Sequence, residues 1–232
     1  MIGILIQLAV SWVLIWFFDK KNLSVLGWRP TKQRLADFVL FFLVSVFFCS
    51  AGFLLKLYFG KQQWQLNPGL SVHLIFSGVW WNIKSVLFEE LIFRGVLLYM
   101  LITKLGAVKG IILSAVAFGI YHWFSFGVIG NPVQMGIVFI ITGIMGLVLA
   151  YGYAKTFSLY LPAGIHFGWN LTQIFVFSQG PIGKGILIPV DAKPFRTDSY
   201  FVFFLVTFLP LILVLFTGYL LIRKRKQAEI EI

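Results

Sequence analysis

Long apolar stretches separated by short polar connections make up most of the chain. Within each stretch, apolar residues occupy every helical face, which is typical of a helix buried in protein or lipid. Only helices and closed barrels pair all backbone groups inside a bilayer, and the period-2 alternation of barrel strands is absent. The pattern therefore predicts membrane helices. The seven candidate spans are residues 2–18, 38–59, 70–101, 108–126, 133–153, 159–178 and 200–222.

The third stretch is longer than the other six. A straight crossing needs about 20 residues, so we expect the beginning of this stretch, at 70–80, to be an interfacial helix or a separate element. The first stretch has no preceding base and no small-residue cleavage site, and Lys20 and Lys21 follow it, so we interpret it as a retained anchor. The sequence predicts an all-α, polytopic membrane helical bundle with seven or eight transmembrane helices.

Composition excludes an ordinary soluble enzyme. Of the 232 residues, 59% are apolar and 12% are charged, whereas about 25% are charged in a typical soluble domain. Although the net charge is +11, the bases form no aromatic-interleaved patch, so we expect no nucleic-acid partner. The short connections leave no room for a soluble domain. We expect one integral membrane domain over 1–232, with its catalytic core at about 70–178.

The distribution of bases predicts the orientation. With the N-terminus outside, the inner connections and tail hold twelve Lys and Arg residues, including the run 223–226, and the outer connections hold four: Lys61, Lys184, Lys193 and Arg196. Because cytoplasmic loops are enriched in Lys and Arg, we expect a cytoplasmic C-terminus. Short loops favour a multi-pass protein of a bacterial plasma membrane.

Two of the eight acids lie within a span, and they are adjacent. Glu89 and Glu90 are in the third stretch, and Arg94 follows Glu90 by one helical turn, the favourable order for an ion pair. Glu89 points about 100° away and should have a different role. The six other acids are expected outside the spans: Asp19, Asp37, Asp191, Asp198, Glu229 and Glu231. Ionisable groups at membrane depth usually mark a functional site.

Two further spans carry polar residues at a comparable depth. His122 lies one turn after Phe118, and Asn170 lies one turn after His166. At a rise of 1.5 Å per residue, Glu89, His122, His166 and Asn170 lie about 10–21 Å from the cytoplasmic ends of their spans. We therefore expect these four side chains to surround one cavity.

This set of groups suits hydrolysis. Glu89 can accept a proton from water, and His122 can hold that water. His166 and the Asn170 amide can donate hydrogen bonds to an oxyanion, while Glu90 and Arg94 form a supporting ion pair. Alternatively, Glu89, His122 and His166 hold a divalent metal such as zinc, whose bound water attacks. The residues alone leave both alternatives open.

Three short motifs resemble those of the CPBP intramembrane protease family. This family includes type II CAAX prenyl proteases and bacterial bacteriocin-processing or immunity proteins of the Abi type. The motifs are Glu-Glu-Leu-Ile-Phe-Arg at 89–94, Phe-Gly-Ile-Tyr-His at 118–122 and His-Phe-Gly-Trp-Asn at 166–170. They occur in the family's order on successive apolar stretches, and the resemblance spans residues 86–170, about a third of the chain.

The resemblance implies a helical membrane endopeptidase. Glu89 and His122 would act on the attacking water, His166 and Asn170 would stabilise the oxyanion, and Glu90 and Arg94 would support them. Family members are often labelled metalloproteases, although a glutamate-dependent mechanism without a metal is also consistent with the motifs. The expected substrate is a membrane-associated peptide or protein. The alternative is a non-catalytic immunity or regulatory partner that keeps the same fold; a proton-coupled transporter would require inverted halves, which the sequence does not show.

Overall fold

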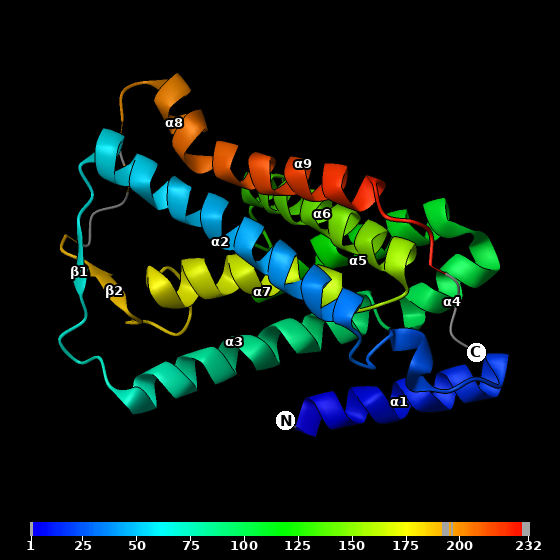
Figure 1. Cartoon of the computed structure of the whole chain (residues 1–232). Coiled ribbons are helices and arrows are strands. Elements are labelled where there is room, and N and C mark those ends of the chain that lie inside the picture. The colour runs from blue at the N-terminus through cyan, green and yellow to red at the C-terminus, as the bar shows by residue number, and fades with distance from the viewer. Residues whose placement is uncertain (1, 192–194, 196, 229–232) are drawn as a thin grey trace.

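The computed structural model describes residues 2–191, 195 and 197–228, and these confirm an all-α fold. Long helices run side by side along the molecule, with α2 crossing its middle (Figure 1). The helices are α1 (Ile2–Asp19), α2 (Lys32–Gly60), α3 (Val72–Phe93), α4 (Val96–Leu105), α5 (Ala107–Ser125), α6 (Pro132–Thr156), α7 (Tyr160–Asn170), α8 (Tyr200–Thr207) and α9 (Leu209–Arg223), with a 3-10 turn at Leu23–Leu26.

Several helices are suited to a bilayer, as expected of a multi-pass membrane protein. In the described part of the chain, α1, α2, α5 and α6 are long and apolar enough to cross, and α8 with α9, bent by 45°, would make a fifth span. Helix α3 contains Lys84, Glu89 and Glu90, which lower its hydropathy, and α7 has only 11 residues before it continues as a π-helical turn over Leu171–Val176. The expected seven or eight spans are therefore not confirmed.

The break in the third apolar stretch is not where we expected it. The stretch is one regular helix from Val72, where the Ser71 hydroxyl accepts the Leu74 N–H, and it breaks at Arg94 and Gly95 before α4 begins. Only glycine fits at position 95, because a Cβ there would collide with the carbonyl oxygen of Leu91. The expected depth of Glu89 was counted along one continuous helix that ends at Leu101. Because the helix ends at Phe93, that depth is wrong.

Asp37 is also not where we expected it. It lies inside α2, is buried, pairs with Arg225 and accepts a hydrogen bond from Gln33 (2.9 Å). The helix begins at Lys32, six residues before the apolar stretch. Asp37 therefore lies within the candidate span α2, at its N-terminal end.

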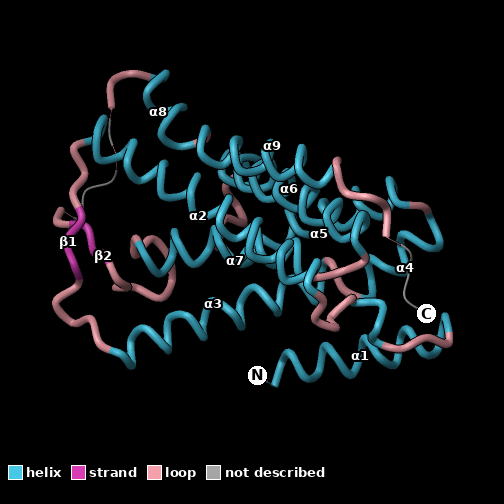
Figure 2. Tube along the Cα trace, viewed as in Figure 1, coloured by secondary structure: helices cyan, strands magenta, loops and turns pink. Residues whose placement is uncertain are grey.

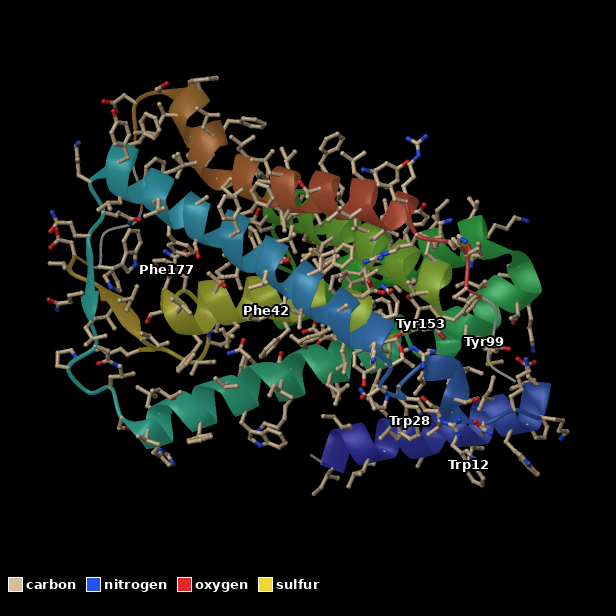
Figure 3. All side chains as sticks on the ribbon, viewed as in Figure 1. Trp12, Trp28, Phe42, Tyr99, Tyr153 and Phe177 are labelled. Carbon is tan, nitrogen blue, oxygen red and sulfur yellow. The ribbon has the colours of Figure 1, made fainter. Side chains whose placement is uncertain are left out.

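A small sheet that the apolar pattern did not predict lies at one end of the bundle. Strand β1 (Trp64–Leu66) pairs antiparallel with β2 (Leu187–Pro189) (Figure 2). Beside it, Phe177 stacks on Phe53 with ring centroids 3.9 Å apart and meets Trp64 edge-on (Figure 3). These contacts join the α2–α3 connection to the segment that follows α7.

The other end of the bundle collects base-rich connections. There α1 and α6 end, α2 begins and α9 ends, at the right of Figure 1. The backbone N–H of Leu159 donates to the Leu26 carbonyl (3.1 Å), and Lys104 lies 3.6 Å from Asp19. Four residues assigned to loops or the tail, Lys193, Arg196, Glu229 and Glu231, lie outside the described residues.

Candidate active site

A fully buried carboxylate joins α3 to α7. Glu90 accepts a hydrogen bond from Arg94 Nε at 2.6 Å and a second from Arg94 Nη2, and its Oε1 lies 2.6 Å from His166 Nδ1. Both Glu90 and Arg94 are 0% exposed. Arg94 caps α3 and still donates its backbone N–H to the Glu90 carbonyl (2.8 Å), so the one-turn spacing is preserved. The contact with His166 fixes the register of α7 against α3.

The neighbouring carboxylate, that of Glu89, lies near two imidazole rings. Glu89 Oε2 lies 3.8 Å from His122 Nε2 and 3.7 Å from His166 Nε2. These separations are too long for direct hydrogen bonds but suit a water that bridges the carboxylate and an imidazole. Glu89 Oε2 is buried and has no hydrogen-bond partner among the described residues. Three helices, α3, α5 and α7, thus bring three polar atoms to one point.

Hydrogen bonds on the far side of each imidazole orient its Nε2. His122 Nδ1 lies 2.8 Å from the Phe118 carbonyl oxygen. Because a carbonyl oxygen only accepts, Nδ1 carries the hydrogen and Nε2 of the neutral ring is an acceptor. In His166, Nδ1 is bound to Glu90 and Nε2 faces Glu89. Both rings therefore present Nε2 to the Glu89 carboxylate.

Phe118 connects these groups, and the sequence indicated it only as the residue one turn before His122. Its ring centroid is 4.4 Å from that of His122 and 6.0 Å from that of His166, and the Arg94 guanidinium carbon lies 4.3 Å above it. The ring is buried and covers one side of the polar cluster. A buried aromatic ring there keeps water from the ion pair and strengthens its electrostatics.

Asn170 is near the cluster along the chain, but among the described residues no hydrogen bond joins its side chain to the cluster. It is the last residue of α7, one turn after His166, and it is half-buried. Its side-chain amide makes no hydrogen bond within the described residues. The amide is therefore available to a bound molecule.

The geometry gives no support to the metal alternative. Among the residues that the structure describes, no three His, Cys, Asp or Glu side chains are placed to hold a metal ion.

Close packing of α7 against α2 holds His166 in position. A Cβ added at Gly164 would lie 2.6 Å from the Phe38 carbonyl oxygen, and one at Gly168 would lie 2.6 Å from the Phe42 carbonyl oxygen. Small residues at helix interfaces allow this approach. Phe42 lies on α2 beside α7 (Figure 3), and its ring stacks on Phe167 at 5.7 Å.

We expect Gly168→Leu to reduce the yield of folded protein, because the new side chain meets rigid backbone of α2. Overpacking of this kind costs about 1–3 kcal/mol or more. The measurement is the monodisperse fraction in size-exclusion chromatography of detergent-solubilised protein. The control is Gly136→Leu, since a Cβ at Gly136 meets nothing within 4 Å. Equal yields of the two variants would contradict the packing argument.

Comparison with known families supports the sequence motifs. Residues 71–172, a little under half of the chain, match the family model described as type II CAAX prenyl endopeptidase Rce1-like. All six candidate residues lie within the matched segment. No curated protein and no solved structure matches the chain. The family is one of proteases and indicates a peptide or protein substrate in a lipid bilayer. The resemblance to the CPBP family is confirmed by this match: residues 71–172 are similar to the type II CAAX prenyl endopeptidase Rce1-like family.

Proposed function

We propose that the protein is an intramembrane endopeptidase that hydrolyses a peptide bond in a membrane-associated peptide or protein by using a water activated by Glu89 and His122. One observation carries the proposal. Glu89 Oε2, which has no hydrogen-bond partner among the described residues, lies 3.8 Å from His122 Nε2 and 3.7 Å from His166 Nε2. A carboxylate with an imidazole at water-bridging distance provides the groups that general acid–base hydrolysis requires.

In the proposed reaction, one water hydrogen is bound by Glu89 Oε2 and the other by His122 Nε2. The oxygen lone pair then attacks the scissile carbonyl carbon as Glu89 takes the first hydrogen as a proton. The carbonyl oxygen becomes an oxyanion. Glu89 returns the proton to the amide nitrogen as the carbon–nitrogen bond breaks, which releases a carboxyl product and an amine product. The carboxylate is regenerated at the end of the cycle.

His166 and Asn170 are proposed to bind the oxyanion. Because His166 Nδ1 is occupied by Glu90, donation to an oxyanion requires a hydrogen on Nε2, and hence the imidazolium form. The Glu90 carboxylate orients the ring through Nδ1, as a buried carboxylate does in a catalytic triad. Arg94 in turn offsets the charge of Glu90. These contacts give Glu90 and Arg94 a positioning role.

The site is proposed to lie at membrane depth and to open towards the cytoplasm. The proposed topology places α3 and the α7 π-helical segment in the bilayer interior, in addition to the more apolar spans. Packing against α2 shields α7 from lipid. The base-rich end of the bundle then faces the cytoplasm of a bacterial cell, with the N-terminus outside.

A peptide-cleavage experiment tests the proposal. Purified protein in detergent or liposomes is incubated with fluorogenic peptides, each prepared with and without a C-terminal prenylcysteine, beside Glu89→Gln and His122→Ala variants. Cleavage by the unmodified protein that both variants lose supports an endopeptidase. If both variants fold normally and still restore the phenotype of cells that lack the protein, the protein is a non-catalytic partner instead.

We expect Asn170→Ala to lower kcat by about 10²–10³-fold, the usual effect of removing one oxyanion donor. KM should change little, because the donor acts mainly on the charge that develops in the transition state. Steady-state kinetics on a cleaved peptide provide the measurement. Gln173→Ala, which removes a half-buried amide one turn further on, is the control. A loss confined to KM would assign Asn170 to substrate binding.

A further inference from the structure

A polar cavity lies at the base-rich end of the bundle, away from the catalytic groups. It is a concave pocket of about 480 Å³ where the start of α2 meets the ends of α6 and α9. We call it the basic pocket. The residues that matter here are Arg34, Asp37, Thr156, Lys224, Arg225 and Lys226.

The segment after α9 is folded back over the ends of the other helices. Arg225 pairs with Asp37, Gln227 Nε2 donates to the Ala154 carbonyl (2.6 Å), and the backbone N–H of Ala228 donates to the Lys155 carbonyl (2.9 Å). These contacts fix the segment from both sides of Lys226. Lys224 and Lys226 are exposed and line the pocket. Lys224, Arg225 and Lys226 therefore have fixed positions in the wall of the pocket. This role is additional to the expected role of these bases in orienting the protein in the membrane.

The charge of the basic pocket favours an anion. Among the described residues that line it, the one acid, Asp37, is already bound by Arg225 and Gln33, and Lys224 and Lys226 add two exposed positive charges. The N-terminus of α2 opens into the same space with Thr31 as its cap, and a 29-residue helix presents partial positive charge there. A phosphate group matches this combination of cations and backbone N–H donors.

We propose that the basic pocket binds the phosphate headgroup of an anionic phospholipid. The pocket lies where three candidate spans end, the level of the headgroups. An apolar groove of about 430 Å³ runs along α6 and α9 and is lined by residues such as Ile144, Leu215 and Tyr219. Tyr219 lies five residues before Lys224, about 7.5 Å along the helix. The acyl chain of a lipid can therefore lie in the groove between α6 and α9, while the phosphate of the same lipid binds in the basic pocket at the ends of these helices.

A lipid-binding titration tests this proposal. Full-length protein in dodecylmaltoside micelles is titrated with fluorescent phosphatidylglycerol, and separately with the phosphatidylcholine analogue. We expect phosphatidylglycerol to bind more tightly, and Lys224→Gln/Lys226→Gln to weaken it about 30-fold, on the usual scale for two lysines near a membrane surface. Lys224→Arg/Lys226→Arg should bind as the unmodified protein does.

Matched controls separate the basic pocket from general surface charge. Lys104→Gln/Lys109→Gln removes two exposed charges from the same end of the bundle, and it should weaken binding less than threefold. Equal weakening by both pairs, or equal affinity for the two lipids, would overturn the proposal. Displacement of the lipid by sodium phosphate alone would also overturn it in favour of a free phosphate ligand. Because the tested lysines do not touch the catalytic cluster, these results are independent of peptide cleavage.

Discussion

Replacing Glu89 by glutamine is expected to reduce peptide hydrolysis by about 10³-fold or more while leaving the fold intact. A glutamine side chain has nearly the same shape but cannot accept the proton of the attacking water, and general base catalysis typically contributes 10²–10⁴-fold. Glu89 makes no hydrogen bond with the described residues through Oε2, so its charge is not needed for packing. The measurement is kcat/KM on a cleaved peptide, together with the thermal unfolding midpoint.

Asp19→Asn serves as the control for this substitution. Asp19 ends α1, and its nearest base is Lys104 at 3.6 Å, so the variant removes an acid far from the cluster. It should retain normal activity. If Glu89→Gln kept more than a tenth of the activity, Glu89 would not be the general base.

Replacing Arg94 by alanine is expected to destabilise the protein by about 3–5 kcal/mol, because it leaves a buried charge without its partner. Glu90 is fully buried and would keep only the contact with His166. The folded yield and the activity should therefore fall together. Size-exclusion profiles and thermal unfolding of the solubilised protein measure the loss.

A paired substitution separates stability from positioning. Glu90→Gln with Arg94→Met removes both charges with similar side-chain volumes, and buried ion pairs replaced in this way often retain stability. We expect the double variant to recover folded yield but not activity, because His166 loses the carboxylate bound to its Nδ1. Arg94→Ala protein with normal yield and melting behaviour would contradict the structural part of this account.

Much of the candidate site follows from the positions of polar residues in apolar stretches. Ionisable groups are so unfavourable in a bilayer that Glu89, Glu90 and Arg94 stand out, and the helical repeat assigns the two acids to different faces. In the structure Glu89 lies near His122 and His166, whereas no hydrogen bond joins Asn170, which the same argument places with them, to these residues. The approximate limits of most helices also follow from the same apolar pattern.

Other features depend on contacts between helices that a one-dimensional pattern does not contain. The Glu90–His166 contact requires a particular rotation of α7 against α3, and the Phe118 ring is one of many apolar side chains until its neighbours are placed. Gly95 is one of many glycines, so the break of α3 could not be located from it. The three-residue strands are too short for a periodic signal. Asp37 appeared to precede its span because its partner, Arg225, is 188 residues away.

The central claim is that Glu89 and His122 act on the same water, and a double-variant kinetic cycle tests it most directly. Single-turnover cleavage of one peptide is measured for the unmodified protein, Glu89→Gln, His122→Gln and the double variant. Residues that act as a unit are strongly non-additive. We therefore predict that the double variant is no slower than the slower single variant, within about threefold. Rate losses that multiply in the double variant would show that the two side chains act independently and would contradict the proposed site.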